Sequence, residues 1–489
     1  MAASVADIAY SRSMLRPILP VDLVFLWIDR PETPANVGAL LLFDPPAGLG
    51  AAAAARQVVR AYRAARPTPP FDCVPDLPTL GLPQWRPTAR LDPRRHVRLE
   101  RLPAPGDLDQ LCRLVARLHE PMLDRSRPLF GVHVIEGLAT GQFAVYFKSH
   151  HASWDGRYAL ERVFGNLPRE AGAIAPPFFA AQPGGGDAPS AGEAATGLTW
   201  GLRGLVALAA GLRELLATLS TRARAAAGSA RPPGNRPFAG PHTRFNEPVA
   251  PARSFGCFDL PIDEMRVVAR AAGGTLNDVA LAVVDAGVAQ FLAAHGERPR
   301  QPLVAMCPVS LRAPGDRDAT TKVATLFVPL GTPRAGAASR LRQIVANTRE
   351  AKSEFRGFSH EAALDYAMLA FGLWFASNAL GLGAVTRPVI NLVASNVGGV
   401  EGPRYLGRSR LAAVYPVSMI ADPTGLNVTM LSVNERMDFG IVANAAVADA
   451  ARIARACEAA FEELRRRVKP AGRSRPRRAR TPAARPLRT

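Results

Sequence analysis

Short apolar runs separated by proline-rich connections mark the first half of the chain. Residues 37–43 and 132–135 are two such runs. The clearest is residues 142–148, where large apolar side chains recur at every second position from Phe143. A period of two is typical of a β-strand. The pattern therefore predicts several strands in this half.

The best-defined strand runs directly into His150 and His151, which are followed by Asp155 and Gly156. Apolar residues at helical spacing within residues 158–164 then predict a helix. The histidines thus stand at a turn from strand to helix, where side chains can project into a cleft. Because the chain has only 8 histidines, an adjacent pair at this place is the strongest candidate for catalysis.

A change in composition separates the two halves. Glycine, proline and alanine dominate residues 175–195, and leucines recur at helical spacing within residues 198–221, which predicts a flexible connection and an amphipathic helix. We expect this helix to pack against the domains rather than to lie on a membrane. The expected division is an N-terminal half at 1–175, a linker at 176–250, a C-terminal half at 251–468 and a disordered basic tail at 469–489.

The second half combines helix and strand patterns. Thr275 and Asp278 form a T-x-x-D cap before an apolar helix, and Asn277 lies in the first turn of that helix. Predicted strands follow at residues 303–307, 325–330, 426–432 and 437–443. Because 489 residues exceed what one hydrophobic core usually supports, these alternating elements indicate two α/β units.

The formal net charge of +19 is concentrated near the end of the chain, where residues 465–489 hold many arginines and no acid. A proline-interrupted basic block cannot bury apolar surface, so we expect a disordered tail and no nucleic-acid partner. Peripheral attachment to an anionic membrane or a lipid-inclusion surface and a solvated tail without a partner are equal alternatives.

Residues 366–386 carry no charge and are long enough to cross a bilayer. Their glycine, serine and asparagine residues favour a buried or interface-lying helix, so we expect no transmembrane helix. We also expect no secretory leader and no disulfide framework, because the five cysteines lie far apart. A cytoplasmic location is expected, with peripheral attachment at the inner membrane left open.

The histidine pair suggests general base catalysis. An imidazole with its ordinary pKa of about 6.5 can take a proton from a hydroxyl at about pH 7, and acyl transfer to an alcohol requires that step. The chain has no G-x-S-x-G elbow, which favours direct transfer over a serine hydrolase. A metal site is not expected, because the other histidines offer no ligand spacing with the pair.

Asp155 and Gly156 close the motif. Our hypothesis is that Asp155 binds an arginine and holds the turn, with Arg312 as the candidate partner. Gly156 would allow the tight backbone there.

The motif His150-His151-x-x-x-Asp155-Gly156 resembles that of the bacterial wax ester synthase/diacylglycerol acyltransferases, within the coenzyme A-dependent acyltransferase superfamily. Peptide-synthetase condensation domains share this short motif, so other segments are needed to distinguish the two families. The segments that resemble the wax synthases are 124–130 (DRSRPLF), 134–138 (VIEGL), 277–279 (NDV), 308–312 (PVSLR), 395–399 (SNVGG), 425–429 (GLNVT) and 439–440 (FG). The similarity extends over residues 19–460, without the linker and the tail.

The resemblance implies an α/β fold of two chloramphenicol acetyltransferase-like subdomains with a tunnel at their interface. It implies His151 as the general base and His150 as its support. Asn277 would lie near the reacting carbonyl and help the oxyanion, although a plain helix-start role is the alternative. No cofactor is implied, since acyl coenzyme A is a substrate.

The implied reaction moves a fatty acyl group from coenzyme A to a long-chain alcohol or diacylglycerol and gives wax ester or triacylglycerol. The sequence departs from the family's pattern at two places: Phe130 replaces the family's tryptophan, and Gly398-Gly399 stands where the family usually has Pro-Gly-Pro. These departures weaken the assignment of the substrate more than that of the reaction type. Two alternatives stay open: a condensation-type acyltransferase with another acceptor, and an inactive protein that binds lipid inclusions.

Overall fold

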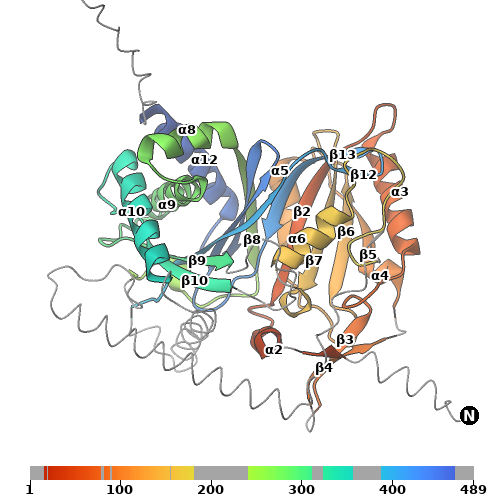
Figure 1. The fold of residues 1–489 in the computed structure, drawn as a ribbon. Helices are drawn as coiled ribbons and strands as arrows, with labels where there is room; N and C mark the ends of the chain where they lie inside the picture. The colour runs from red at the N-terminus through yellow and green to blue at the C-terminus, as the bar shows by residue number, and fades with distance from the viewer. Residues whose placement is uncertain are drawn as a thin grey trace, which may run out of the picture.

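The computed structural model describes residues 16–18, 20–78, 82–88, 91–154, 156–180, 240–310, 323–355 and 387–467. The predicted amphipathic helix at 198–221, the apolar stretch at 366–386 and the basic tail lie outside these residues, as do Asp155 and Arg312. Two six-stranded sheets, one in each half, form the body of the described chain, and a three-stranded sheet lies beside the first (Figure 1).

The N-terminal sheet is built around the strands that the alternating pattern predicts. β2, β6 and β7 confirm the runs predicted at 37–43, 132–135 and 142–148. β7 pairs antiparallel with β2 on one side and with β6 on the other. In spatial order the strands are β12 (Tyr405–Leu406), β13 (Ser409–Val417), β2 (Asn36–Asp44), β7 (Phe143–His150), β6 (Phe130–Glu136) and β5 (Val97–Arg101).

Apolar side chains cover both faces of this sheet. One face packs against α3 and α6, whose Val58 and Phe164 lie in its buried cluster. The other face, which includes Leu40 and Tyr146, packs against α5 and against β8 (Arg253–Pro261) of the C-terminal half. The helices of this half are α3 (Ala51–Ala64), α4 (Pro93–His96), α5 (Leu108–His119) and α6 (Gly156–Gly165).

The C-terminal half is a second six-stranded sheet with its helices on the face away from the first half (Figure 1). Its strands confirm all four runs predicted between residues 303 and 443. In spatial order they are β10 (Val323–Pro329), β9 (Val304–Ser310), β11 (Leu392–Val400), β14 (Leu426–Val433), β15 (Arg436–Asn444) and β8. The helices are α8 (Ile262–Ala272), α9 (Leu276–Ala294), α10 (Ala337–Phe355) and α12 (Ala450–Arg467), and the short 3-10 helix η2 (Arg244–Asn246) precedes β8.

The helix α9 begins with the predicted T-x-x-D cap, which the structure confirms. The Asp278 N–H donates to Thr275 Oγ1 at 3.4 Å, and the Thr275 N–H donates to Asp278 Oδ2 at 2.7 Å. This reciprocal pair satisfies two donors at the helix start that have no partner within the helix. The cap therefore fixes where α9 begins and places Asn277 in its first turn.

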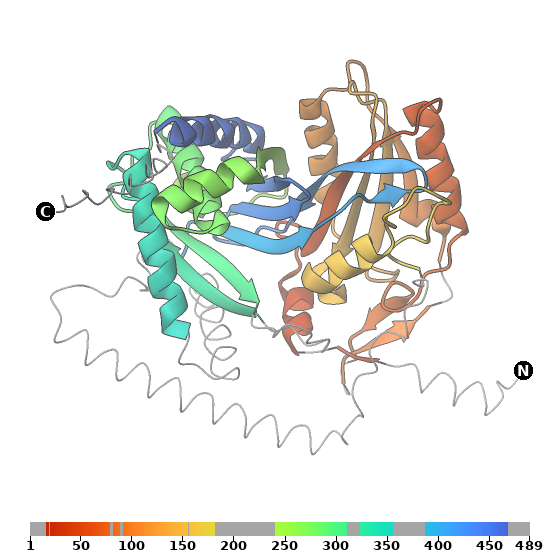
Figure 2. The same ribbon diagram turned by 45° about the horizontal axis from the view of Figure 1, so that its top comes forward.

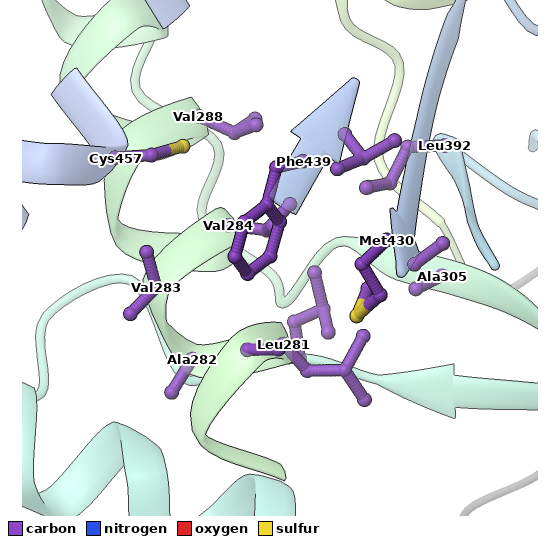
Figure 3. Packing of buried hydrophobic residues seen from close by; sticks show 14 of the residues in the cluster. Leu281, Ala282, Val283, Val284, Val288, Ala305, Leu392, Met430, Phe439 and Cys457 are labelled. Atoms are coloured by element: carbon purple, nitrogen blue, oxygen red, sulfur yellow. The ribbon is translucent and has the colours of Figure 1, made fainter. Parts of the chain in front are cut away.

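The helix α9 is also the centre of the C-terminal core. Val284 of α9 lies near Phe439 from the sheet, and Cys457 of α12 lies near Val288 (Figure 3). Within the described residues α9 is the one helix long and apolar enough to cross a membrane, and 67% of its apolar window is buried inside the protein. An apolar surface all around a helix is expected when its neighbours enclose it, as α8, α10, α12 and the sheet do here.

The two halves share strands across their boundary. After β11 the chain crosses over, and β12 and β13 join the N-terminal sheet, where Val414 of β13 pairs with Leu41 of β2 (Figure 2). The chain then returns to the C-terminal sheet as β14. The N-terminal sheet is therefore completed by residues 405–417, which come late in the chain.

A small sheet and one helix cover the end of the N-terminal sheet where β7 stops. The sheet consists of β1 (Arg16–Pro17), β4 (Gln84–Pro87) and β3 (Cys73–Asp76), and the helix is α2 (Pro20–Ile28). Leu26 of α2, Leu129 before β6 and Ala152 after β7 belong to one buried cluster. The helix α2 therefore packs on the turn that carries the histidine pair, at the lower edge of the N-terminal half (Figure 1).

Candidate active site

The strand β7 carries the two histidines to one end of the N-terminal sheet. His150 is its last residue and pairs with Asn36 of β2. The His151 N–H donates to the Ala35 carbonyl at 2.8 Å, and the chain then forms the short 3-10 helix η1 (His151–Ser153) before α6. The structure thus confirms the predicted turn from strand to helix.

The side chain of His150 is fully buried and both of its nitrogens have neighbours. Nδ1 accepts the Ala152 N–H at 3.1 Å, so this nitrogen keeps a lone pair. Nε2 then carries the ring proton and lies 3.3 Å from Asp29 Oδ2. This contact is longer than an ideal charge-assisted hydrogen bond and lacks hydrogen-bond geometry, and Nε2 has no hydrogen-bond partner within the described residues. His150 therefore cannot accept a substrate proton without breaking its bond to Ala152.

Asp29 directly follows α2 and is fully buried beside His150. Its Oδ1 accepts the Ala35 N–H at 2.9 Å, and its Oδ2 also lies 3.2 Å from Arg125 Nη2. Burial alone would raise the pKa of Asp29, but the interactions of its carboxylate with His150, Ala35 and Arg125 outweigh burial and hold this pKa below its usual value. Arg125 also donates to the Leu26 carbonyl in α2. The Asp29 carboxylate, at the end of α2, thus contacts both the residue before β2 and the histidine turn.

His151 lies in a different environment from His150. Its ring stacks on Phe25 of α2 with 3.8 Å between ring centroids and 17° between ring planes. The residue is half-buried, whereas the His150 side chain is 0% exposed. Stacking on one face limits the rotation of the ring. Of the two histidines, His151 is the less deeply buried.

The other predicted site residues are only partly placed. Gly156 begins α6, directly after the turn. Asn277 is half-buried in the first turn of α9, where N–H groups without helical partners can favour an anion. Asp155 and its candidate partner Arg312 lie outside the described residues, so their pairing stays a hypothesis. No group of three or more His, Cys, Asp or Glu side chains in the described ranges is placed to hold a metal ion.

The C-terminal sheet lies against the helix that follows the histidines. Gly398 sits at a bulge in β11 with a φ of 105°, which glycine adopts readily and other residues do not. A Cβ at this position would lie 3.7 Å from the Leu160 side chain of α6. Leu431 and Val433 of β14 belong to the same buried cluster as α6. The Gly398-Gly399 segment is therefore part of the junction between the two halves.

Sequence reasoning missed Asp29, Phe25 and the contact of Arg125 with Asp29. Arg125 lies in the DRSRPLF segment, but its acidic partner is 96 positions earlier in the chain. Nothing local in the sequence pairs Phe25 with His151 or Asp29 with His150. Only the packing of α2 on η1 brings them together.

Solved structures share this architecture of two sheets. The wax ester synthase/diacylglycerol acyltransferase from Marinobacter aquaeolei VT8 matches with a TM-score of 0.73 and 28% identity, over 92% of this chain and 99% of that one. The first condensation domain of the calcium-dependent antibiotic synthetase matches in fold with a TM-score of 0.56 and 16% identity, over 94% and 98%. The predicted class, a mixed α/β fold like that of chloramphenicol acetyltransferase, is confirmed; the tunnel stays a prediction.

The sequence comparisons define the family more narrowly. Residues 18–280 match the wax ester synthase/diacylglycerol acyltransferase catalytic domain, and residues 320–465 match the C-terminal domain of the same family. A putative diacylglycerol O-acyltransferase of Mycobacterium tuberculosis (strain H37Rv) is 36% identical over 88% of this chain and 86% of its own. Another from that strain is 34% identical over 92% and 99%. The chain belongs to the wax ester synthase/diacylglycerol acyltransferase family.

Proposed function

We propose that this acyltransferase moves a fatty acyl group from its coenzyme A thioester to a lipid alcohol, with His151 as the general base. The observation that carries the proposal is the difference between the two histidines. Both nitrogens of His150 face protein partners in a fully buried site, whereas His151 is half-buried with its ring stacked on Phe25. A base must reach the proton it removes, and His151 meets that condition better.

The reaction needs few protein groups. His151 takes the proton of the acceptor hydroxyl, and the oxygen attacks the thioester carbonyl. The tetrahedral oxyanion is stabilised by nearby donors, for which Asn277 at the start of α9 is our candidate. The intermediate then collapses, and the coenzyme A thiolate leaves and takes back the proton from His151.

The acceptor is proposed to be diacylglycerol or a long-chain alcohol. The names of the mycobacterial relatives support diacylglycerol, and the name of the Marinobacter enzyme supports both acceptors. We further propose that the protein works in the cytoplasm, where the basic tail can reach an anionic lipid surface.

An assay of the full chain with palmitoyl coenzyme A tests the acceptor class directly. Hexadecanol and diacylglycerol would be offered in turn, and both ester and released coenzyme A would be measured. Ester formed with either lipid supports the proposal. Product formed only with a carrier-bound acceptor would instead identify a condensation-type acyltransferase, and binding of lipid without any ester would identify an inactive lipid-binding protein.

A further inference from the structure

We propose that Asp29 is a positioning residue of the active site: its carboxylate holds His150 in the tautomer that lets the histidine turn form, and thereby orients His151. The inference rests on the proposed role of His151 as general base. It assigns a function to a buried acid that lies 121 positions before His150 in the sequence and carries no recognisable motif.

In the described part of the chain, the polar atoms beside the Asp29 carboxylate are nitrogens. Oδ1 receives the Ala35 N–H at 2.9 Å, and Oδ2 lies 3.3 Å from His150 Nε2 and 3.2 Å from Arg125 Nη2. A carboxylate is the side-chain group that can accept from all three, because its two oxygens carry about four lone-pair sites and no proton. The guanidinium of Arg125 compensates the buried negative charge.

Through these contacts, Asp29 supports one backbone hydrogen bond on each side of His151. On one side, Asp29 holds the N–H of Ala35, whose carbonyl accepts the His151 N–H at 2.8 Å. On the other side, His150 Nε2 lies 3.3 Å from Asp29 Oδ2, and Nδ1 accepts the Ala152 N–H at 3.1 Å. His151 lies between these two bonds.

The helix α2 adds a third restraint. Phe25 and Asp29 are four positions apart, and the Phe25 ring stacks on His151 while Asp29 contacts His150. A movement of α2 would therefore displace both imidazoles together. The buried cluster of Leu26 with Ala152 holds the helix on the turn.

The substitution Asp29→Asn tests the proposal because it keeps the shape of the side chain and changes its hydrogen bonding. An amide offers one acceptor oxygen and two N–H donors. If the oxygen keeps the Ala35 N–H, the amide donors face two other donors, His150 Nε2 and Arg125. His150 can relieve this conflict by moving its proton to Nδ1, and the bond from Ala152 is then lost.

The matched control is Asp285→Asn in the C-terminal half. Asp285 is also buried, lies 2.6 Å from an arginine nitrogen of Arg340 and accepts the Gly331 N–H at 3.1 Å. It has the same kinds of partner as Asp29 but no contact with the histidine turn. Loss of a buried charged pair should lower the melting temperature of both variants, so a specific effect of Asp29 appears in the kinetics.

The full-length wild type and both variants would be compared in the palmitoyl coenzyme A assay. For Asp29→Asn we expect kcat to fall on the order of 100-fold, as for a misplaced catalytic group, with the KM for palmitoyl coenzyme A changed by less than about 3-fold. Asp285→Asn should keep its kcat. The proposal would be overturned if Asp29→Asn had the same kcat as wild type. It would also be overturned if kcat fell in both variants in proportion to their loss of melting temperature.

Nitrogen-15 NMR of histidine-labelled protein supplies a readout independent of turnover. The His150 signals, identified by their loss in His150→Gln, should report the Nε2–H tautomer in wild type and the Nδ1–H tautomer in Asp29→Asn. An Nδ1–H tautomer in wild type would overturn the proposal even if Asp29→Asn fails to fold. If wild type forms no ester, the proposed function fails, and the NMR result still decides whether Asp29 sets the tautomer of His150.

Discussion

His119, at the end of α5, connects the N-terminal sheet to the crossover between the two halves. Its Nδ1 lies 2.8 Å from the Tyr146 hydroxyl of β7, and its Nε2 donates to the Ser418 carbonyl at 3.2 Å. Burial, together with the positive charges of Lys148 and Arg253, lowers the pKa of His119 to about 3. The imidazole is therefore uncharged where the two halves meet.

This buried imidazole predicts a loss of stability in mild acid. The unfolded chain binds a proton at His119 below about pH 6.5, while the folded chain does not until about pH 3. The contribution of His119 is thus present above about pH 6.5 and is lost as the pH falls. Urea unfolding at several values between about pH 7.5 and pH 4 should show a smaller decline for His119→Gln than for wild type.

Buried carboxyl groups also titrate in this pH range, so the informative quantity is the difference in the free energy of unfolding between wild type and His119→Gln. Burial raises the pKa of Asp285 and of Asp438 to about 6, which opposes the His119 effect in both proteins equally. If the free energy of unfolding declines equally with falling pH in wild type and His119→Gln, His119 does not cause the predicted loss of stability.

A second prediction concerns the place where β15 meets the crossover. A Cβ at Gly440 would clash with the backbone carbonyl oxygen of Pro416, which cannot rotate away as a side chain can. Gly440→Ala should therefore lower the free energy of unfolding by about 2 kcal/mol or more. Gly172→Ala is the control, because a Cβ there would meet nothing within 4 Å. Equal urea midpoints for the two variants would show that this contact does not constrain the halves.

A third prediction concerns the basic tail. Removal of residues 470–489 should reduce sedimentation with anionic phospholipid vesicles and leave sedimentation with neutral vesicles unchanged, because each arginine near an anionic surface contributes about 1 kcal/mol. Added salt should release the full-length protein from the anionic vesicles. Identical sedimentation of the truncated and full-length chains would assign surface binding, if any, to another part of the protein.

Local signals in the sequence predicted much of the fold. The period of two before His150 predicts β7, and the T-x-x-D spacing of Thr275 and Asp278 predicts the start of α9, because both depend on neighbours a few positions apart. The place of β13 in the N-terminal sheet could not be predicted this way. Its partner β2 lies more than 350 positions earlier, and only the tertiary fold brings them together.

The same limit applies to the candidate site. The sequence identifies the histidines because they are adjacent and follow a strand. It does not indicate that His150 is buried against Asp29 or that His151 stacks on Phe25, since these contacts depend on how α2 packs. These contacts give a physical reason for the different roles that we propose for the two histidines, which the sequence implied only by family resemblance.

The most direct test of the central claim is ester formation by His151→Ala with palmitoyl coenzyme A and the acceptor that wild type prefers. His295→Ala is the control, because His295 caps the far end of α9 and hydrogen-bonds to the Phe291 carbonyl. We predict that His151→Ala loses a factor on the order of 100 to 10,000 in kcat with an unchanged melting temperature, whereas His295→Ala keeps wild-type kcat. Equal ester formation by His151→Ala and wild type would contradict the account.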